Sequence, residues 1–417
     1  MRNFLNRFKK QLIIFLAVVG PGLITAIADN DAGGVATYTV AAATYGMASK
    51  FMFIPETLLL ALTQEIGARI AIVTRKGLGD LIRERYGIKL SLFIFILYFI
   101  TNQGVVLQNV SGLKSSLQLF NLPWQFFLII FCALLIFIVI KFNYRKLQNI
   151  FLFMILFYLA YIISAWLAHP NWKEAIQESI IWPKKVDIRN AGFWFSRIAV
   201  LGTTITAWGQ FFVHSYILDK KLTIDHLKAE KVEVYLGAIV TSIFSWMMAV
   251  AVTYTIFANK VHVVDGYSAA LAMKPLAGQL STILFSVGLF GASILGLTIV
   301  PLATAYVFSE LFGYEGSLDA NFKKGRLFYG FFILQITLGL IITLFPQTSL
   351  FKLTLYADYL NGVMLPIIFF FLIKFSEDEE IMGKYTSRGF TSFFVRLSGI
   401  VITIAVILTF VGKVFKF

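Results

Sequence analysis

Two aspartates lie inside a long apolar segment near the amino terminus. Asp29 and Asp31 stand near the middle of residues 11–45, and Gly33 and Gly34 follow them directly. A charged side chain at the centre of a bilayer costs at least ~2.5–3.5 kcal/mol by insertion scales, and paired glycines weaken a helix. Secondary transporters build ion sites at mid-depth from broken membrane helices. The stretch therefore predicts a membrane helix that is broken around a cation site.

A second apolar segment, residues 191–218, is interrupted in a similar way. Gly202, Thr206 and Gly209 stand near its centre together with other polar residues. This segment comes five membrane segments after the first. Matching interruptions in corresponding helices of two five-helix halves indicate an inverted-repeat transporter, with its substrate site at the interface between the repeats.

The composition is that of a protein with many membrane-spanning helices. Of the 417 residues, 58% are hydrophobic and only 14% are charged, whereas soluble domains are about 25% charged. The net charge of +14 comes from basic residues that fall in the loops between apolar segments. This pattern is typical of membrane topology rather than of nucleic-acid binding. Cys132 is the one cysteine, so neither an intrachain disulfide nor a cysteine metal cluster is expected.

The apolar pattern predicts an all-α membrane protein with a single transmembrane domain, residues 1–417. The basic start of the chain and the apolar run after it are interpreted as the first membrane helix, because the run is too long for a signal peptide. The first repeat would cover residues 11–168 and the second residues 191–375. Segments of about 20 residues or more, long enough to span a bilayer, are expected at residues 11–45, 51–74, 90–119, 123–141, 147–168, 191–218, 232–258, 280–312, 327–346, 350–375 and, as an extra eleventh helix, 391–414.

The distribution of Lys and Arg predicts the orientation of these segments. Basic residues gather before the first segment and in every second loop after it, whereas the alternate loops are poorer in them, apart from residues 173–189. By the positive-inside rule, the amino terminus lies in the cytoplasm and the carboxyl terminus outside. We expect a monomer in the cytoplasmic membrane that contacts lipid and has no nucleic-acid partner.

Several stretches of the chain resemble the Nramp family of divalent-metal transporters. Residues 20–37 are similar to that family's Gly-Pro-Gly-Leu and Asp-Pro-Gly-Asn stretch, and residues 64–87 to its second helix and the loop that follows. Shorter matches extend the resemblance over the whole chain, at residues 145–147, 214–215, 365–366 and 382–383. The resemblance implies a LeuT-type inverted repeat of five plus five helices and an eleventh, with helices one and six broken at mid-membrane.

The resemblance also implies a set of metal ligands. In the family, an Asp and an Asn of the first helix, a Met and a backbone carbonyl of the sixth, and a Gln of the tenth surround a transition metal. Here Asp31 keeps the Asp position, Gly34 replaces the Asn and Asp358 replaces the Gln. The Met position falls on a residue without sulfur, either Thr206 or Ala207. The candidate metal-binding residues are Asp31, Asp358, Asp29, Asn30, Gly34, Thr206 and Ala207.

The resemblance further implies a changed proton route. The family's third-helix Glu corresponds to Asn109, and the Pro-His pair of its sixth helix is absent, whereas His214 keeps a family position. We therefore expect proton coupling to be weak or absent. Residues expected to gate or line the pathway are Asn109, Asn361, Trp208, Gln210 and His214.

The predicted ligands favour a hard cation. Thioether sulfur suits softer transition metals, whereas carboxylate, carbonyl and water oxygens suit Mg²⁺, Ca²⁺ and Mn²⁺. Mg²⁺ keeps several waters and uses only one or two carboxylates, which Asp31 and Asp358 could provide. In lacking the Met ligand, the chain resembles the Nramp-related magnesium transporters. We expect Mg²⁺ or Mn²⁺ to be preferred over Fe²⁺, as the transported substrate rather than as a cofactor.

Other interpretations of the same residues remain open. A chain of this fold could instead be a sodium- or proton-coupled transporter of a small organic solute such as an amino acid, although acidic side chains at the break would repel a carboxylate. An enzyme is not expected, because no nucleophile–base pair, metalloprotease signature or phosphate-binding loop is present. Asp29 could instead pair with a hydroxyl, Asp358 with a lysine or with Tyr359, and Glu65 with Arg69 four residues on.

Overall fold

The apolar segments form helices throughout the part of the chain that the structure describes. The computed structural model describes residues 21–181, 183, 186–187, 189–261, 266–314, 316–320, 322–345 and 350–415. In these ranges there is no β-strand. The start of the first expected segment, residues 11–20, lies outside them.

Both expected helix breaks are present. The first segment is divided into α2 (Pro21–Ala28) and α3 (Ala32–Tyr45), with residues 29–31 in a turn between them. The second is divided into α10 (Ala191–Thr204) and α11 (Ala207–Asp219). In each break a polar side chain caps the half that follows, because Asp31 accepts a hydrogen bond from the Gly34 amide and Thr206 from the Gly209 amide. Such caps satisfy amides that a helix start leaves without partners.

Nine further helical segments among the described residues are long and apolar enough to cross a membrane. Together with the two broken segments, whose halves are shorter, they account for the eleven segments expected. They are formed by α4 (Phe53–Thr74), α5 (Leu78–Leu119), α6 (Trp124–Lys141), α7 (Tyr144–Met154) with α8 (Leu159–Leu167), α12 (Leu227–Val252), α13 (Gly266–Phe312), α14 (Arg326–Leu344), α15 (Leu350–Ser376) and α17 (Phe390–Phe415).

Two regions expected to be loops contain helix instead. The third segment was expected to begin at residue 90, but α5 begins at Leu78 and bends at Gly87, whose φ is +76°. Its first turn is stabilised by Asp80, which accepts a hydrogen bond from the Gly77 amide, and by buried Leu78. Because this stretch contains several charged residues, the hydropathy pattern does not indicate a helix there. The loop between α8 and α10 also contains a helix, α9 (Trp172–Ile180).

The acidic run at residues 377–380, which its composition alone would place in a solvated loop, is partly helical and paired. It leads into the short helix α16 (Glu379–Met382). Three arginines from elsewhere in the chain form ion pairs with it: Arg85 with Asp378, Arg388 with Glu379, and Arg396 with Glu377.

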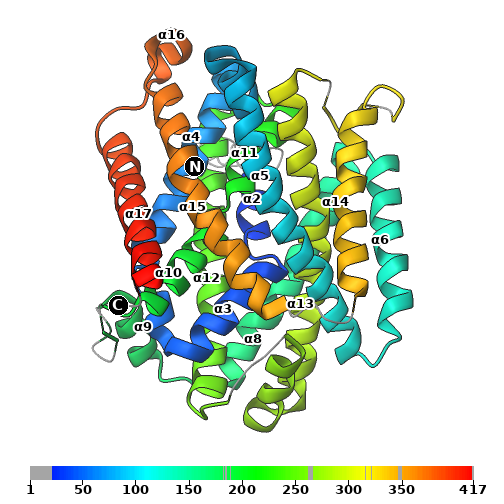
Figure 1. Ribbon diagram of the computed structural model, residues 1–417, viewed down its shortest axis with the longest axis vertical. Coiled ribbons are helices and arrows are strands. Elements are labelled where there is room, and N and C mark those ends of the chain that lie inside the picture. The colour runs from blue at the N-terminus through cyan, green and yellow to red at the C-terminus, as the bar shows by residue number, and fades with distance from the viewer. Residues whose placement is uncertain are drawn as a thin grey trace, which may run out of the picture.

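The broken helices lie in the middle of the helix assembly, as Figure 1 shows, whereas α17 and α6 lie on opposite sides of it. The apolar windows of α17 and α6 are mostly exposed, and that of α13 is mostly buried. Apolar side chains left on the surface of a membrane protein face lipid. Of the two ends of the assembly, one carries α16 and the start of α5, and the other carries α9 and the end of α3 (Figure 1). We call them the α16 end and the α9 end.

Candidate metal-binding site at the helix breaks

Asp31 is held by groups from two helices. Its Oδ1 accepts a hydrogen bond from the Gly34 amide of α3 at 2.9 Å, and its Oδ2 accepts one from Asn109 Nδ2 of α5 at 2.6 Å. Asn109 Oδ1 in turn accepts from the Ala32 amide at 3.0 Å. Asn109 therefore orients the carboxylate and also caps the start of α3.

Asp29 joins the two breaks. It accepts a hydrogen bond from Thr206 Oγ1 at 2.6 Å, and Gln64 Nε2 of α4 lies 3.5 Å from its other oxygen. The sequence analysis considered a hydroxyl as a partner of Asp29. That hydroxyl belongs to Thr206, the residue that caps α11. The contact places the first break directly against the second.

Asp358 of α15 lies against the first turns of α3. It accepts a hydrogen bond of 2.5 Å from Thr37 Oγ1. The alternative partner considered for it, Tyr359, is engaged elsewhere, because its hydroxyl donates to the Val406 carbonyl. Asn361, one helical turn on, accepts from the Ala207 amide at 3.3 Å and so connects α15 with the second break.

Two predicted ligands, Asn30 and Gly34, have structural roles in the packing of the helices. Both amide hydrogen bonds of Asn30 go to Thr241 of α12, at 2.8 Å to its carbonyl and 2.7 Å to its hydroxyl. Gly34 has no room for a side chain, because a Cβ there would lie 2.9 Å from the Asp29 carbonyl oxygen and 3.0 Å from Thr203 Oγ1.

The remaining predicted pathway residues are fully buried on α11. Trp208 packs in the hydrophobic core, and both polar atoms of the Gln210 side chain have no hydrogen-bond partner. His214 Nδ1 bonds to the Gln210 carbonyl at 2.8 Å, while its Nε2 has no partner. A Cβ on Gly67 would lie 2.8 Å from the His214 ring, which therefore packs closely against α4.

The three aspartates are gathered at the breaks but do not form a ready chelate. Asp29, Asp31 and Asp358 are each only 1–2% exposed. Among the described residues, no group of three His, Cys, Asp or Glu side chains is placed to hold a metal ion. Each carboxylate instead has its own hydrogen-bond donor from a side chain. An ion bound here would be held by one or two carboxylates together with neutral oxygens.

Two polar residues of this region were not predicted from the sequence. Thr37 is the donor to Asp358, and Gln108 of α5 lies beside Gly33. Gln108 could have been noticed, because it is a polar residue in a membrane segment directly before Asn109. Thr37 gave no such signal, since a threonine in a helix usually bonds to its own backbone.

Both ends of the broken helices are closed by polar contacts. Toward the α9 end, Arg197 of α10 donates to Glu56 of α4 and to the Ser49 carbonyl. Toward the α16 end, Ser215 of α11 donates to Glu310 of α13 at 2.5 Å, and Tyr306 of α13 donates to Asp219 of α11. The contacts join α10 to α4 toward one end and α11 to α13 toward the other.

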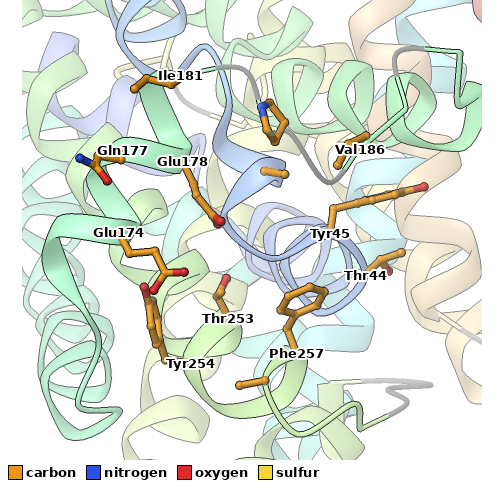
Figure 2. A pocket seen from close by; sticks show the side chains of 13 residues that line it. Thr44, Tyr45, Glu174, Gln177, Glu178, Ile181, Val186, Thr253, Tyr254 and Phe257 are labelled. Atoms are coloured by element: carbon orange, nitrogen blue, oxygen red, sulfur yellow. The ribbon is translucent and has the colours of Figure 1, made fainter.

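A cavity of about 700 Å³ at the α9 end lies apart from the breaks. It is lined by α9, by the end of α3 and by the π-helical turn Thr253–Phe257 that follows α12, and Figure 2 shows the carboxylates of Glu174 and Glu178 directed into it. None of the predicted site residues lines this cavity.

Comparison with known proteins places this architecture in a family. The family model described as Nramp, natural resistance-associated macrophage protein-like, matches residues 22–412, which include both breaks and α15. The chain belongs to the Nramp family. The chain is 24% identical to the divalent metal cation transporter MntH of Latilactobacillus sakei, over 97% of this chain and 91% of the relative.

The Nramp assignment agrees with solved structures of similar fold. The manganese transporter of Eremococcus coleocola superposes with a TM-score of 0.75 at 16% identity, over 95% of this chain and 86% of that one. MhsT, solved in complex with L-phenylalanine, gives a TM-score of 0.62 at 14% identity, over 95% and 97%. At these identities the likeness shows the fold alone, which is the expected LeuT-type membrane fold. The Nramp relatives are named as transporters and not as enzymes.

Proposed function

We propose that this Nramp-family chain transports a divalent metal ion across the cytoplasmic membrane, with Mg²⁺ or Mn²⁺ preferred over Fe²⁺. The observation that carries the proposal is the burial of Asp29, Asp31 and Asp358 at the junction of two broken helices. Carboxylates in a membrane interior are costly unless they serve a cation. The names of the MntH relatives and of the manganese transporter support a divalent metal as that cation.

The preference for a hard ion rests on the atoms around the three carboxylates. Their side-chain partners are the hydroxyls of Thr37 and Thr206 and the carboxamides of Asn109, Gln64, Gln108 and Asn361. None of these groups is a thioether, thiolate or imidazole, and oxygen donors favour Mg²⁺ and Mn²⁺ over softer ions. A Mg²⁺ ion that keeps part of its water shell needs only one or two of the carboxylates.

Weak or absent proton coupling is part of the proposal. Asn109 is the described side chain of α5 that bonds directly to Asp31, and a carboxamide does not take up a proton in the physiological range. His214 bonds to its own helix and packs against α4, so no contact connects it with Asp31. A proton could therefore not pass from Asp31 to either residue as it could to a carboxylate.

Transport would proceed by alternating access around the breaks. In this fold class, one set of helices rocks against another while the substrate site stays near mid-membrane. The two sets of polar contacts at the α9 and α16 ends join different helices and would open in turn. With the amino terminus in the cytoplasm, the α16 end faces the cytoplasm and the α9 end faces outward.

Isothermal titration of the purified chain with Mg²⁺ and with Mn²⁺ tests the proposed site. We expect both ions to bind, and D31N and D358N each to weaken binding by about 10- to 100-fold, the range seen when groups that support a metal site are removed. D225N is the matched control, because Asp225 is exposed on the short turn before α12.

Uptake into proteoliposomes then tests selectivity and coupling. We expect Mg²⁺ or Mn²⁺ to accumulate without acidification of the lumen. A strong preference for Fe²⁺ with acidification would contradict the proposed selectivity and coupling. If neither metal binds, the alternative is a sodium- or proton-coupled transporter of an organic solute, a function for which the fold likeness to MhsT leaves room.

A further inference from the structure

One buried oxygen at the first break has no partner. Gln108 of α5 is 3% exposed, and its Oε1 forms no hydrogen bond. Leaving a buried carbonyl of this kind unsatisfied costs about 1–3 kcal/mol. Such a group in a membrane interior calls for a function.

The orientation of the Gln108 amide is fixed by its other end. Its Nε2 donates to the Thr354 carbonyl of α15 at 2.9 Å. The reverse amide orientation would place two carbonyl oxygens together, so the free atom is the oxygen. The same side chain interacts with the Asp358 carboxylate. Gln108 therefore stands between α3 and α15 with an oxygen turned toward the break.

The Gln108 oxygen lies directly against residue 33, where only a glycine fits. A Cβ on Gly33 would lie 2.8 Å from the Gln108 amide carbon, closer still to its Oε1, and 3.1 Å from Asp31 Oδ1. A neutral oxygen and a carboxylate oxygen thus lie close to the same glycine. Paired oxygens of these two kinds are the donors that Mg²⁺ and Mn²⁺ prefer.

A small void lies beside Gln108 along α5. It measures about 20 Å³, its polar lining residues are Gln108, Ser111, Ser115 and Thr354, and its other lining residues are apolar or glycine. A volume of this size holds about one water molecule.

We infer that Gln108 is a further ligand of the transported cation, with its unpartnered Oε1 binding a divalent ion together with the nearby Asp31 carboxylate. The inference rests on the proposed function, because it adds a neutral oxygen to the same site. Gln108 would let a site with few carboxylates hold a dication through α5 as well as through α3 and α15.

Titration of the full chain with Mg²⁺ and Mn²⁺ tests this assignment. Q108L keeps the approximate volume and removes the oxygen, and we expect it to weaken Mg²⁺ binding by about 10- to 100-fold. Q108E keeps an oxygen at the position and should bind Mg²⁺ at least as tightly as the unmodified chain. In G33A the added methyl group would overlap the Gln108 oxygen and displace it, so Mg²⁺ binding should weaken at least as much as in Q108L.

Gln103 provides a matched control on the same helix. Its Nε2 also donates to a backbone carbonyl, that of Gln335, at 3.2 Å, and its Oε1 also has no partner. Q103L should leave Mg²⁺ affinity unchanged, while all variants should elute as the unmodified protein does in size-exclusion chromatography. If D31N loses binding but Q108L binds as tightly as Q103L, Gln108 is not a ligand and the proposed function still stands. If D31N binds normally, the proposed function itself is wrong.

Should Q108L fail to fold, Q108E and G33A still decide the matter. Unchanged Mg²⁺ affinity in G33A would overturn the inference, because the methyl group displaces the oxygen that is assigned to the ion.

Discussion

Asp31 and Thr206 have the same structural task at two different breaks, since each caps the helix half that follows it. A cap of this kind is worth about 1 kcal/mol. The capping atoms also bring oxygen to the junction of the breaks. The same side chains therefore stabilise the helices and bring oxygen to the proposed ion site. A useful variant changes one of these two effects and leaves the other unchanged.

The contact between Asn109 and Asp31 allows proton coupling to be introduced. In N109D, one carboxylate oxygen can still accept from the Ala32 amide. The other would replace Asn109 Nδ2, which lies 2.6 Å from Asp31 Oδ2 in the unmodified chain. Two carboxylates so close must share a proton. A bound dication would have to displace that proton, so affinity should rise with pH.

Titration calorimetry at about pH 6 and about pH 8 measures this effect, since the shared proton must leave before the dication binds. We expect Mg²⁺ affinity to increase by about tenfold more in N109D than in the unmodified chain. Equal pH dependence of the two proteins would show that the residues are not in contact when the ion binds.

The hydroxyl of Thr37 should contribute to stability through Asp358. T37V keeps the shape of the side chain and removes the 2.5 Å hydrogen bond to the carboxylate. A hydrogen bond to a charged group is worth about 1.5–3 kcal/mol, so the melting temperature in detergent should fall. T39V is the control, because Thr39 is equally buried on α3 but bonds only to the Val35 carbonyl. Equal melting temperatures for T37V and T39V would contradict the assigned role of Thr37.

At the scale of elements, α10 and α15 cross so closely that only glycine fits between them. A Cβ on Gly202 of α10 would lie 2.5 Å from the Gly362 amide nitrogen and would clash with the Asp358 carbonyl oxygen. The crossing therefore sets the position of Asp358 relative to the second break. Overpacking of this kind costs about 1–3 kcal/mol.

G202A should accordingly lower the melting temperature and weaken Mg²⁺ binding together, because it pushes the backbone of Asp358 away from the breaks. G330A is the matched control. Gly330 of α14 is exposed and has no atom within 4 Å of the added Cβ, and alanine is the better helix former. A G202A variant as stable as G330A would mean that the two helices do not approach as closely as described.

The elements were predictable wherever the signal was local. The Asp-Asn-Asp-Ala-Gly-Gly stretch and the Gly and Thr residues of the second segment indicated both breaks, because polar groups and glycines disfavour a membrane helix at the point where they occur. The start of α5 was missed because its charges imitate a loop. The partners of Asp358 and Gln108 could not be predicted, since Thr37 lies 321 residues from Asp358 and Thr354 lies 246 residues from Gln108.

At the scale of the whole molecule, the site is closed toward both ends by different pairs of helices. Arg197 joins α10 to α4 toward the α9 end through Glu56, and Ser215 and Tyr306 join α11 to α13 toward the α16 end. Removing one partner costs about 3–5 kcal/mol for a buried ion pair such as Arg197–Glu56 and about 1–3 kcal/mol for a buried hydrogen bond, enough to shift a balance between closed and open forms. Each set of contacts should therefore control access from one side only.

A single cysteine beside the second break reports this access. Cys132 is buried and is the chain's one native thiol, so C132A with A207C leaves one reactive group at a position that is fully buried. An impermeant thiol reagent should label it slowly in both intact cells and inside-out vesicles. Adding E56Q should speed labelling in intact cells, whereas S215A with Y306F should speed it in inside-out vesicles, because the amino terminus is expected in the cytoplasm.

Labelling after unfolding in detergent gives the full signal. Equal acceleration from both sides would contradict separate closures, and exchanged sides would reverse the predicted orientation.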